Sequence, residues 1–335
     1  MLRTVLSKST SDSYVISGTM PIIMLLALTP LTGCQTTTMS NSPSKAPITM
    51  NMSNPLTMGM PTIDRQGYIA YVEAQGVGAA KISTLYRIRP DGSDRQLIDK
   101  LNGYIYAPAW SADGQMLAYS KQEARMHPKI YIYDVKSNSH NLVVNAEGSN
   151  LSPSFSPDSK KLLYSSTVGG NADIYEMNLS DGSTKQLTTL PSTEVQPSYA
   201  SDGQSFVYTS DKVRAGRPSI YRYNFATGHA ALISTGGYAA SPQLSLDAQK
   251  LAYLNGRKAA VMMLNSGKVI NLADTGLDEP ARLSPSGQYA VYPTRTSQIS
   301  NQEGSSLVVH SLSGNTSYVI SSKTGGVVRS PIWGR

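Results

Sequence analysis

Short segments in which apolar and polar residues alternate recur along most of the chain. One set of four such segments covers residues 154–156, 161–164, 173–177 and 185–188. Alternation with a period of two gives each segment one apolar and one polar face, as in a half-buried β-strand. Asp181 and Gly182, which separate the last two segments, form a hairpin-turn signal because both residue types tolerate positive φ. The pattern predicts a four-stranded antiparallel sheet with tight turns.

One phrase introduces five of these predicted sheets, and its starts are separated by 45, 44, 45 and 39 residues. In its fullest form it reads Pro-x-aromatic-Ser-x-Asp-Gly, and the copies start at Pro108, Pro153, Pro197, Pro242 and Ala281. Each copy leads, eleven residues after its start, to a tyrosine: Tyr119, Tyr164, Tyr208, Tyr253 and Tyr292. A repeat of this length, built from short strands, is typical of β-propeller blades. A propeller is a disc with a central channel and two loop-bearing faces, which favours a binding platform over catalysis.

The two ends of the chain complete the predicted ring. Residues 330–334 match residues 107–111, the innermost strand of a blade, whereas residues 68–71 match residues 116–119, a second strand. We therefore expect the C-terminal segment to supply the innermost strand of an otherwise incomplete first blade. The expected fold is all-β: a six-bladed β-propeller of four-stranded antiparallel blades over residues 61–335.

A single four-stranded blade cannot bury both of its faces, so neighbouring blades must cover each other. A bulky residue stands two places before four of the repeated tyrosines: Leu117, Leu162, Phe206 and Leu251. We expect these side chains to fill the seams between blades, each contributing roughly 1.5–3 kcal/mol by burial.

Composition narrows the class of protein. Charged residues make up 15% of the chain and the net charge is +7, with no block of like charges. A basic cluster interleaved with stacking aromatics is missing from the sequence, so we expect no nucleic-acid partner. The single cysteine, Cys34, excludes an intrachain disulfide.

Cys34 closes a signal-like N-terminal segment. Arg3 and Lys8 precede an apolar run at residues 21–31, which is too short for a stable transmembrane helix and suits a signal peptide. Leu-Thr-Gly-Cys resembles the bacterial lipobox, which implies removal of residues 1–33, a diacylglycerol on the Cys34 sulfur and an acyl chain on its amine. Two or three acyl chains suffice for stable membrane anchoring. Residue 35 is Gln, not the Asp of lipoproteins kept at the inner membrane, so the periplasmic face of the outer membrane is the expected location.

Residues 34–60 are rich in Ser, Thr, Asn, Pro and Met and lack strand periodicity, so we interpret them as a flexible tether. Two Met-x-Met pairs there, at 50–52 and 58–60, would suit copper(I), but we expect unstructured sequence without metal.

The repeats resemble the propeller of the TolB family, built from PD40-type repeats that are similar to WD40 repeats. The stretch from Phe206 to Arg222 carries the resemblance, with its Ser-Asp, Gly-Arg-Pro and Ile-Tyr-Arg steps. It implies a periplasmic protein-binding role related to the Tol–Pal envelope system, with an envelope protein or peptide such as a peptidoglycan-associated lipoprotein as the partner. TolB-type proteins carry an α/β domain before the propeller and are soluble, whereas here only the tether separates Cys34 from the first blade. We therefore expect a TolB-like propeller lipoprotein without that N-terminal domain.

No catalytic or metal-binding motif is evident, and we expect neither an enzyme nor a cofactor. No histidine pair has ligand spacing, and Gly-x-Ser-x-Gly and Gly-x-x-x-x-Gly-Lys are missing from the sequence. The turn residues Asp113, Asp158, Asp202 and Asp247 are expected to bond backbone amides.

Binding residues are therefore sought where the chain enters each innermost strand, at the predicted channel mouth. They are Tyr104, Tyr106, Asn150, Glu194, Gln196, Tyr238, Asp278, Glu279 and Arg329. Loops on the same face add basic side chains: Arg125, Lys212, Arg214, Arg217 and Arg295. Such aromatic and charged groups suit partner recognition. An alternative remains a carbohydrate or small-ligand binder, or a glycan-active enzyme that uses Glu194 and Glu279 as paired carboxylates.

Overall fold

The computed structural model describes residues 59–335, apart from residues 78–79, 234–236, 297–303 and 315. All of the described residues belong to one compact unit, Ile48–Arg335. The expected signal peptide, Cys34 with its expected lipid, and all but the last two residues of the expected tether lie outside the described residues.

Short strands account for almost all regular structure in the described part of the chain. The one helix described there, α1, covers Thr62–Arg65. The strands are β1 (Ile69–Gln75), β2 (Ile82–Ile88), β3 (Gln96–Trp110), β4 (Met116–Glu123), β5 (Lys129–Asp134), β6 (Ser139–Val144), β7 (Asn150–Phe155), β8 (Lys161–Ser166), β9 (Asp173–Asn178), β10 (Thr184–Gln186), β11 (Glu194–Tyr199), β12 (Ser205–Ser210), β13 (Ser219–Asn224), β14 (Ala230–Leu232), β15 (Ala239–Leu244), β16 (Lys250–Asn255), β17 (Lys258–Met263), β18 (Val269–Asp274), β19 (Arg282–Leu283), β20 (Tyr289–Thr296), β21 (Gly304–Ser311), β22 (Ser317–Ser321) and β23 (Val327–Trp333).

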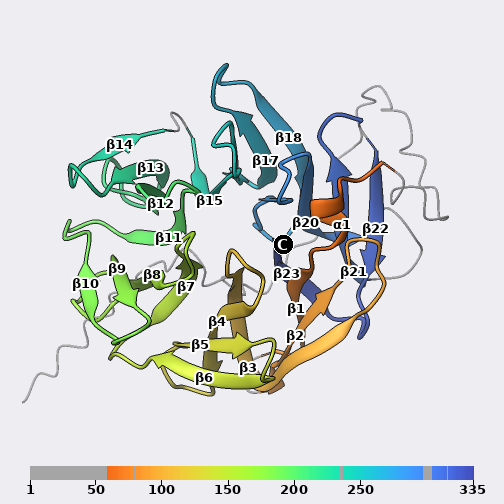
Figure 1. Cartoon of the computed structure of the whole chain (residues 1–335), viewed down its shortest axis with the longest axis horizontal. Coiled ribbons are helices and arrows are strands. Elements are labelled where there is room, and N and C mark those ends of the chain that lie inside the picture. Colours follow the sequence, from red (N-terminus) through yellow and green to blue (C-terminus); the bar gives the residue numbers. More distant parts are fainter. Residues whose placement is uncertain (1–58, 78–79, 234–236, 297–303, 315) are drawn as a thin grey trace, which may run out of the picture. The chain divides into compact units, whose positions relative to one another are not determined.

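These strands form a β-propeller of four-stranded antiparallel blades, whose sheets succeed one another around a centre (Figure 1). β7–β10, β11–β14, β15–β18 and β19–β22 are separate four-stranded sheets, and the remaining strands form one sheet of seven in the order β23-β1-β2-β3-β4-β5-β6. The long strand β3 joins two blades in that sheet, because its first half pairs with β2 and its second half with β4. The sequence had predicted two separate strands there.

The C-terminal strand joins the first blade, as the sequence predicted. β23 pairs antiparallel with β1, with Ile69 opposite Trp333 and Ala74 opposite Val327, and Figure 1 labels the two strands beside each other. Gly334 then packs on a neighbouring aromatic ring: a Cβ added there would lie 2.4 Å from Cγ of Trp110. The two ends of the described chain thus share one sheet.

The innermost strands share a β-bulge one residue before the repeated proline. The residues at this position have positive φ, between 43° and 57°: Ala107, Ser152, Gln196, Ser241 and Ser330. The strand register shifts at each of them. A bulge re-aims a strand end, and a non-glycine residue with positive φ costs of order 1 kcal/mol that the surrounding contacts must offset.

The fifth repeat departs from this bulge because Pro280 occupies the corresponding position. The proline ring fixes φ near −65° and excludes the left-handed region. β19 accordingly retains only Arg282 and Leu283, and positive φ moves two residues upstream to Asp278. A single residue, Pro280, therefore explains why β19 is the shortest of the described strands.

The predicted seam residues are fully buried. Leu117, Leu162, Phe206 and Leu251 each have 0% relative exposure. The repeated tyrosines pack beside them, with Tyr119, Tyr164, Tyr208, Tyr253 and Tyr292 all buried. Every described blade therefore buries its faces against its neighbours, which fixes the positions of the loops.

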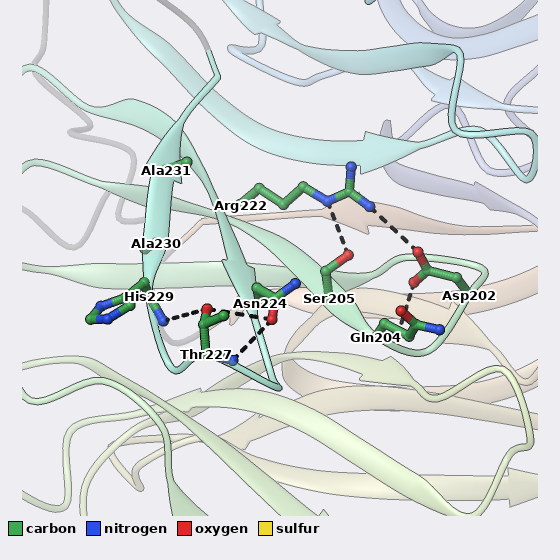
Figure 2. Close-up of a pocket in the computed structure, with 9 residues that line it drawn as sticks. All are labelled: Asp202, Gln204, Ser205, Arg222, Asn224, Thr227, His229, Ala230 and Ala231. Atoms are coloured by element: carbon green, nitrogen blue, oxygen red, sulfur yellow. Dashed lines mark hydrogen bonds and ion pairs between the residues drawn. The ribbon is translucent and has the colours of Figure 1, made fainter.

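Two of the outer strands are short. β10 and β14 have three residues each. Beside β14 lies a hollow with a volume of about 560 Å³, lined by residues of β12, β13, β14 and the turns between strands (Figure 2).

The turn aspartates bond within their own turns, as expected. Asp113, Asp158 and Asp247 each accept a hydrogen bond from the Ser hydroxyl two residues earlier and from the backbone N–H two residues later. Asp202 has Ala200 in place of that Ser, and within its turn it accepts the backbone N–H of Gln204. These contacts assign the repeated aspartates to turn structure.

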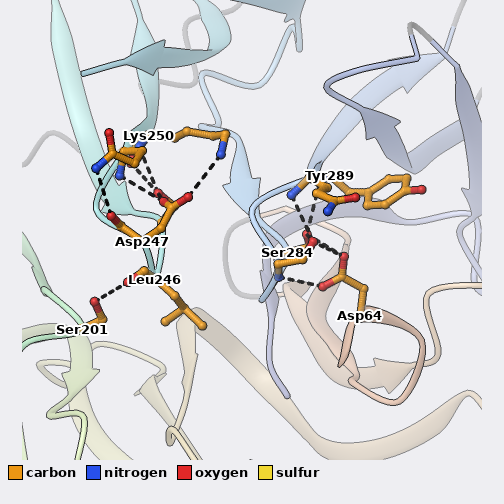
Figure 3. Close-up of polar contacts among 11 residues, drawn as sticks. Asp64, Ser201, Leu246, Asp247, Lys250, Ser284 and Tyr289 are labelled. Atoms are coloured by element: carbon orange, nitrogen blue, oxygen red, sulfur yellow. Dashed lines mark hydrogen bonds and ion pairs between the residues drawn. The ribbon is translucent and has the colours of Figure 1, made fainter. Parts of the chain in front are cut away.

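The fifth repeat has Ser286 where the others have Asp, and a distant carboxylate takes over the contacts. Asp64 on α1 is fully buried and accepts hydrogen bonds from the Ser284 hydroxyl (3.0 Å) and the Ser286 backbone N–H (2.8 Å). The Ser286 hydroxyl donates to it as well, at 2.5 Å. Figure 3 shows Asp64 beside Ser284 in the turn of the fifth repeat. The turn of the fourth repeat, drawn in the same view, has a carboxylate of its own, Asp247. The segment before the first strand is thereby fastened to the last blade.

Candidate functional site

The predicted binding residues lie on one face of the propeller, which we call the entry face. It comprises the β1–β2, β4–β5, β8–β9, β12–β13 and β16–β17 loops, the start of the second half of β3, the end of β20, and the segments that lead into β7, β11, β15, β19 and β23. Antiparallel strands reverse direction at every step, so these connections share one side and the turns with aspartates share the other.

Four of the predicted residues are buried and bonded inside the protein. They are Asn150, Glu194, Gln196 and Glu279. The amide of Asn150 donates to the carbonyl oxygens of Ala146 and Gly148 and accepts from the Ser166 hydroxyl. These contacts fix the loop that leads into β7.

Gln196 connects two blades through the bulge described above. Its Oε1 accepts from the Thr209 hydroxyl at 2.9 Å and from the backbone N–H of Ser241, in the next blade, at 3.0 Å. The bulge directs that N–H away from its own sheet, so a side chain of the preceding blade can satisfy it. The position thus stiffens the channel wall.

Glu194 is a buried carboxyl, and Asp173 is a second buried carboxyl that acts on it. Oε1 of Glu194 accepts from the hydroxyls of Ser192 (2.5 Å) and Ser210 (2.9 Å), whereas Oε2 is buried and has no hydrogen-bond partner among the described residues. Burial is the main cause that raises the pKa of Glu194, and the neighbouring Asp173 raises it further. Burial also raises the pKa of Asp173. Two adjacent buried carboxyls favour holding one proton between them.

Glu194→Gln is expected to stabilise the protein at neutral pH. An acid whose pKa is raised on folding contributes stability below its unfolded pKa and loses it as the pH rises through the folded pKa. The Gln amide takes the place of the protonated acid and does not titrate. We therefore expect the free energy of unfolding to rise by about 1 kcal/mol, and Tm by about 2–4 °C, at pH 7.5. Thermal unfolding from pH 7.5 to 4 checks this: the difference between variant and wild type should shrink as the pH falls. A constant or growing difference would contradict the carboxyl pair.

A cluster of charges lies where the last blade meets the first. Arg329 on β23 pairs with Glu279 at 3.4 Å, and the Ser330 N–H donates to the other oxygen of Glu279 at 3.2 Å. Arg282 donates to the Ser241 carbonyl oxygen at 2.7 Å. Burial lowers the pKa of Arg282 to about 10 and raises the pKa of Glu279. The sequence predicted Arg329 and Glu279 but missed Arg282, which occupies a repeat position held elsewhere by Ala, Ser or Gln.

The aromatic residues of the mouth remain partly accessible. Tyr104 and Tyr106, on the second half of β3, stack with ring centroids 5.6 Å apart and planes 5° apart. The Tyr106 hydroxyl donates to Oε1 of Gln122 at 2.9 Å, which holds this ring in place. Tyr238 is half-buried. Burial, and then the negative charge of the exposed Asp278, raise the pKa of Tyr238.

The predicted basic loop residues are all exposed: Arg125, Lys212, Arg214, Arg217 and Arg295. Exposed apolar side chains accompany them at equivalent loops of four blades: Val77 (69%), Met126 (58%), Val168 (47%) and Val213 (78%). Single exposed apolar residues are ordinary, but these four occupy the same structural position around one face. The entry face thus combines apolar tips, tyrosines and cations.

The hollow beside β14 lies on the opposite, turn-bearing side and was not predicted. Figure 2 shows Arg222 reaching from β13 to Ser205 and Asp202, with Asn224, Thr227 and His229 in the adjoining turn. Arg222 bonds the Ser205 hydroxyl at 3.0 Å and pairs with Asp202 at 3.5 Å. Its cation is therefore already compensated, and the turn's polar groups bond one another.

Among the described residues, no three His, Cys, Asp or Glu side chains lie together in a way that could hold a metal ion. In the same part of the chain, no helix has the length and apolar character needed to cross a bilayer. Glu194 and Glu279 are each engaged by groups of the protein, so neither carboxylate is presented to a ligand.

Comparisons with known proteins agree with this architecture. Residues 65–335 match the family model described as the TolB beta propeller domain, and the chain belongs to that family. "Tol-Pal system protein TolB" of Francisella tularensis subsp. mediasiatica is 30% identical over 258 residues. That alignment covers 72% of this chain and 57% of the relative, so the chain spans little more than half of the curated relative's length.

Solved structures extend the comparison. The crystal structure of TolB from Acinetobacter baumannii is 33% identical with a TM-score of 0.72, over 83% of this chain and 68% of that one. A putative TolB from Agrobacterium tumefaciens, 18% identical, has a TM-score of 0.57 over 76% of this chain and 89% of that one, and supports the fold alone.

Proposed function

We propose that this protein is a non-catalytic scaffold of the bacterial envelope that binds a protein or peptide through its entry face. The observation that carries the proposal is the combination, on one face of a closed ring, of a stacked tyrosine pair, exposed cations and apolar loop tips. Rigid aromatic anchors flanked by charges suit protein recognition. Relatives named Tol-Pal system protein TolB support a role related to that system, with a peptidoglycan-associated lipoprotein as one partner of suitable class.

The propeller in this proposal has six blades. The seven-stranded sheet supports that number, because it divides at β3 into two sections of four strands that share this strand, beside the four separate sheets of four. Residues 1–33 are proposed as a signal peptide, Cys34 as the lipidated residue and residues 34–60 as the tether. The proposed location is the periplasmic face of the outer membrane, where the tether lets the propeller reach partners near the membrane.

A carbohydrate-active role has less support. Retaining and inverting glycosidases need two carboxyl groups facing the substrate about 5–9.5 Å apart. Glu194 is hydrogen-bonded to serines and paired with Asp173, and Glu279 is bonded to Arg329. Each of the two glutamates that the alternative requires is therefore occupied by a structural partner.

Site-specific crosslinking in cells tests the proposed face. Tyr104→p-benzoylphenylalanine is expected to give, on irradiation, an adduct of discrete mass with an envelope protein. The matched control is the same substitution at Leu246, which is 44% exposed on a turn of the opposite face. The same substitution at Val213, an exposed loop residue of the entry face, should also give an adduct. Adducts from Tyr104 and Val213 but not from Leu246 would support the proposal. Adducts from Leu246 alone, or from none of the three positions, would refute it.

A further inference from the structure

Two cations at the entry face differ in whether they have a counter-ion. Arg329, on β23, pairs with Glu279. Lys81, at the end of the β1–β2 loop, is half-buried, and no carboxylate of the described residues lies within ion-pair distance of its ammonium group. Burial, and then the charge of Arg329, lower the pKa of Lys81. A half-buried ammonium group without a counter-ion is stabilised by an anion beside it.

The tyrosine pair forms one wall of the same place. Lys81 Nζ lies 5.6 Å from the ring centroid of Tyr104, and Tyr104 stacks in turn on Tyr106. This cation–π contact leaves the ammonium N–H groups available, because a ring face accepts no strong hydrogen bond. The flat pair of rings offers an apolar surface directly beside the unneutralised charge.

None of the other described charged residues of the cluster is a counter-ion of Lys81. Glu279 is buried and occupied by Arg329 and the Ser330 N–H. Asp278 is exposed and acts on Tyr238. Arg282 is a further, half-buried cation that acts on Glu279, so the charged residues Lys81, Arg329, Arg282 and Glu279 together carry a positive excess.

We infer that Lys81, on the face that also carries Arg329, forms a subsite for a carboxylate of an acidic peptide segment, whose neighbouring residue packs on Tyr104 and Tyr106. The inference rests on the proposed function and names the chemistry of the partner. A carboxylate bound there accepts charge-assisted hydrogen bonds from the ammonium group. It also supplies Lys81 with the counter-ion that no described carboxylate of the chain provides.

Peptide binding to the purified full-length protein tests the subsite. The probe is a fluorescein-labelled peptide, Gly-Glu-Tyr-Glu-Gly, compared by fluorescence anisotropy with Gly-Gln-Tyr-Gln-Gly. Lys81→Met is the informative variant, since Arg329 also holds Glu279 and its loss would leave a buried charge unpaired. Lys258→Met is the matched control: Lys258 is exposed at the start of β17, on the same face, and its loss changes the net charge equally.

We expect the Glu peptide to bind more tightly than the Gln peptide. Lys81→Met should raise the Kd of the Glu peptide about tenfold or more. Lys258→Met should change the Kd by less than about twofold, as for a screened surface charge. Since burial disfavours the charged ammonium form of Lys81, Lys81→Met should melt no lower than wild type. Equal losses in both variants, no loss in either, or equal binding of the two peptides would overturn the subsite. If crosslinking from Tyr104 persists in Lys81→Met while its peptide Kd is unchanged, the proposed entry face stands and only the carboxylate subsite falls.

Discussion

Deletion of residues 327–335 is expected to abolish cooperative unfolding of the propeller. The deletion removes β23, and with it every hydrogen bond on one edge of β1. It also uncovers Ile69 and Tyr71, which pack in one cluster with Val328 and Trp333. Burial of apolar side chains such as these contributes roughly 1.5–3 kcal/mol each, so the loss approaches the total stability of a typical domain.

Differential scanning calorimetry checks this result, together with the near-UV circular dichroism of the aromatic core. Deletion of Arg335 alone is the matched control, because this residue is exposed and lies beyond β23. A synthetic peptide of residues 327–335 added to the truncated protein should restore part of the transition by strand complementation. A sharp, unshifted transition in the truncated protein would show that the ring does not depend on its last strand.

Asp64→Ala is expected to destabilise the protein by about 2–4 kcal/mol, a large effect for a residue outside the blades. The change removes a buried carboxylate and leaves the Ser284 hydroxyl and the Ser286 N–H without their acceptor. The loss should appear as a lower free energy of unfolding in urea with an unchanged slope.

A second substitution makes this prediction sharper. Ser286→Asp restores the repeat's own turn residue, which in three other turns accepts the same pair of hydrogen bonds. In wild type it places a second carboxylate against Asp64 and should destabilise the fold, whereas in the Asp64→Ala background it should recover stability. The double-mutant cycle therefore predicts a change of sign, and additive effects would refute the assignment of Asp64 to the fifth turn.

The sequence predicted those parts of the fold that repeat. Leu117 and its equivalents at each seam, and the pairing of the C-terminal segment with residues near 69, follow from periodicity alone, because each blade must bury the same faces. The continuity of β3 could not be foreseen, since the alternation at Gln96–Asn102 and at Gly103–Trp110 is what two separate strands would also give.

The candidate site was predicted less well than the fold. The sequence located Tyr104, Tyr106 and Arg329 at the mouth, because position in the repeat determines the face. It could not reveal that Glu194 turns inward to Asp173, since both are strand-end carboxylates that would be equally plausible in solvent. Lys81 stands outside the repeated phrase, and its place beside Tyr104 depends on how the first and second blades pack, which the sequence does not show. A signal was available for Asp64: the lone Ser among the turn aspartates indicated a missing carboxylate.

Because β1 and β23 lie side by side, the order in which the strands follow one another along the polypeptide matters little to the assembled ring. Gly334 donates its N–H to the Tyr68 carbonyl oxygen at 2.9 Å, so a short linker would bridge the two ends. A circular permutant opened at the exposed Gly256–Arg257 hairpin would keep every described strand pair and move the point of entry to another blade. Evolution and protein engineering alike can therefore attach such a ring to a membrane or a fusion partner from different blades without redesigning its core.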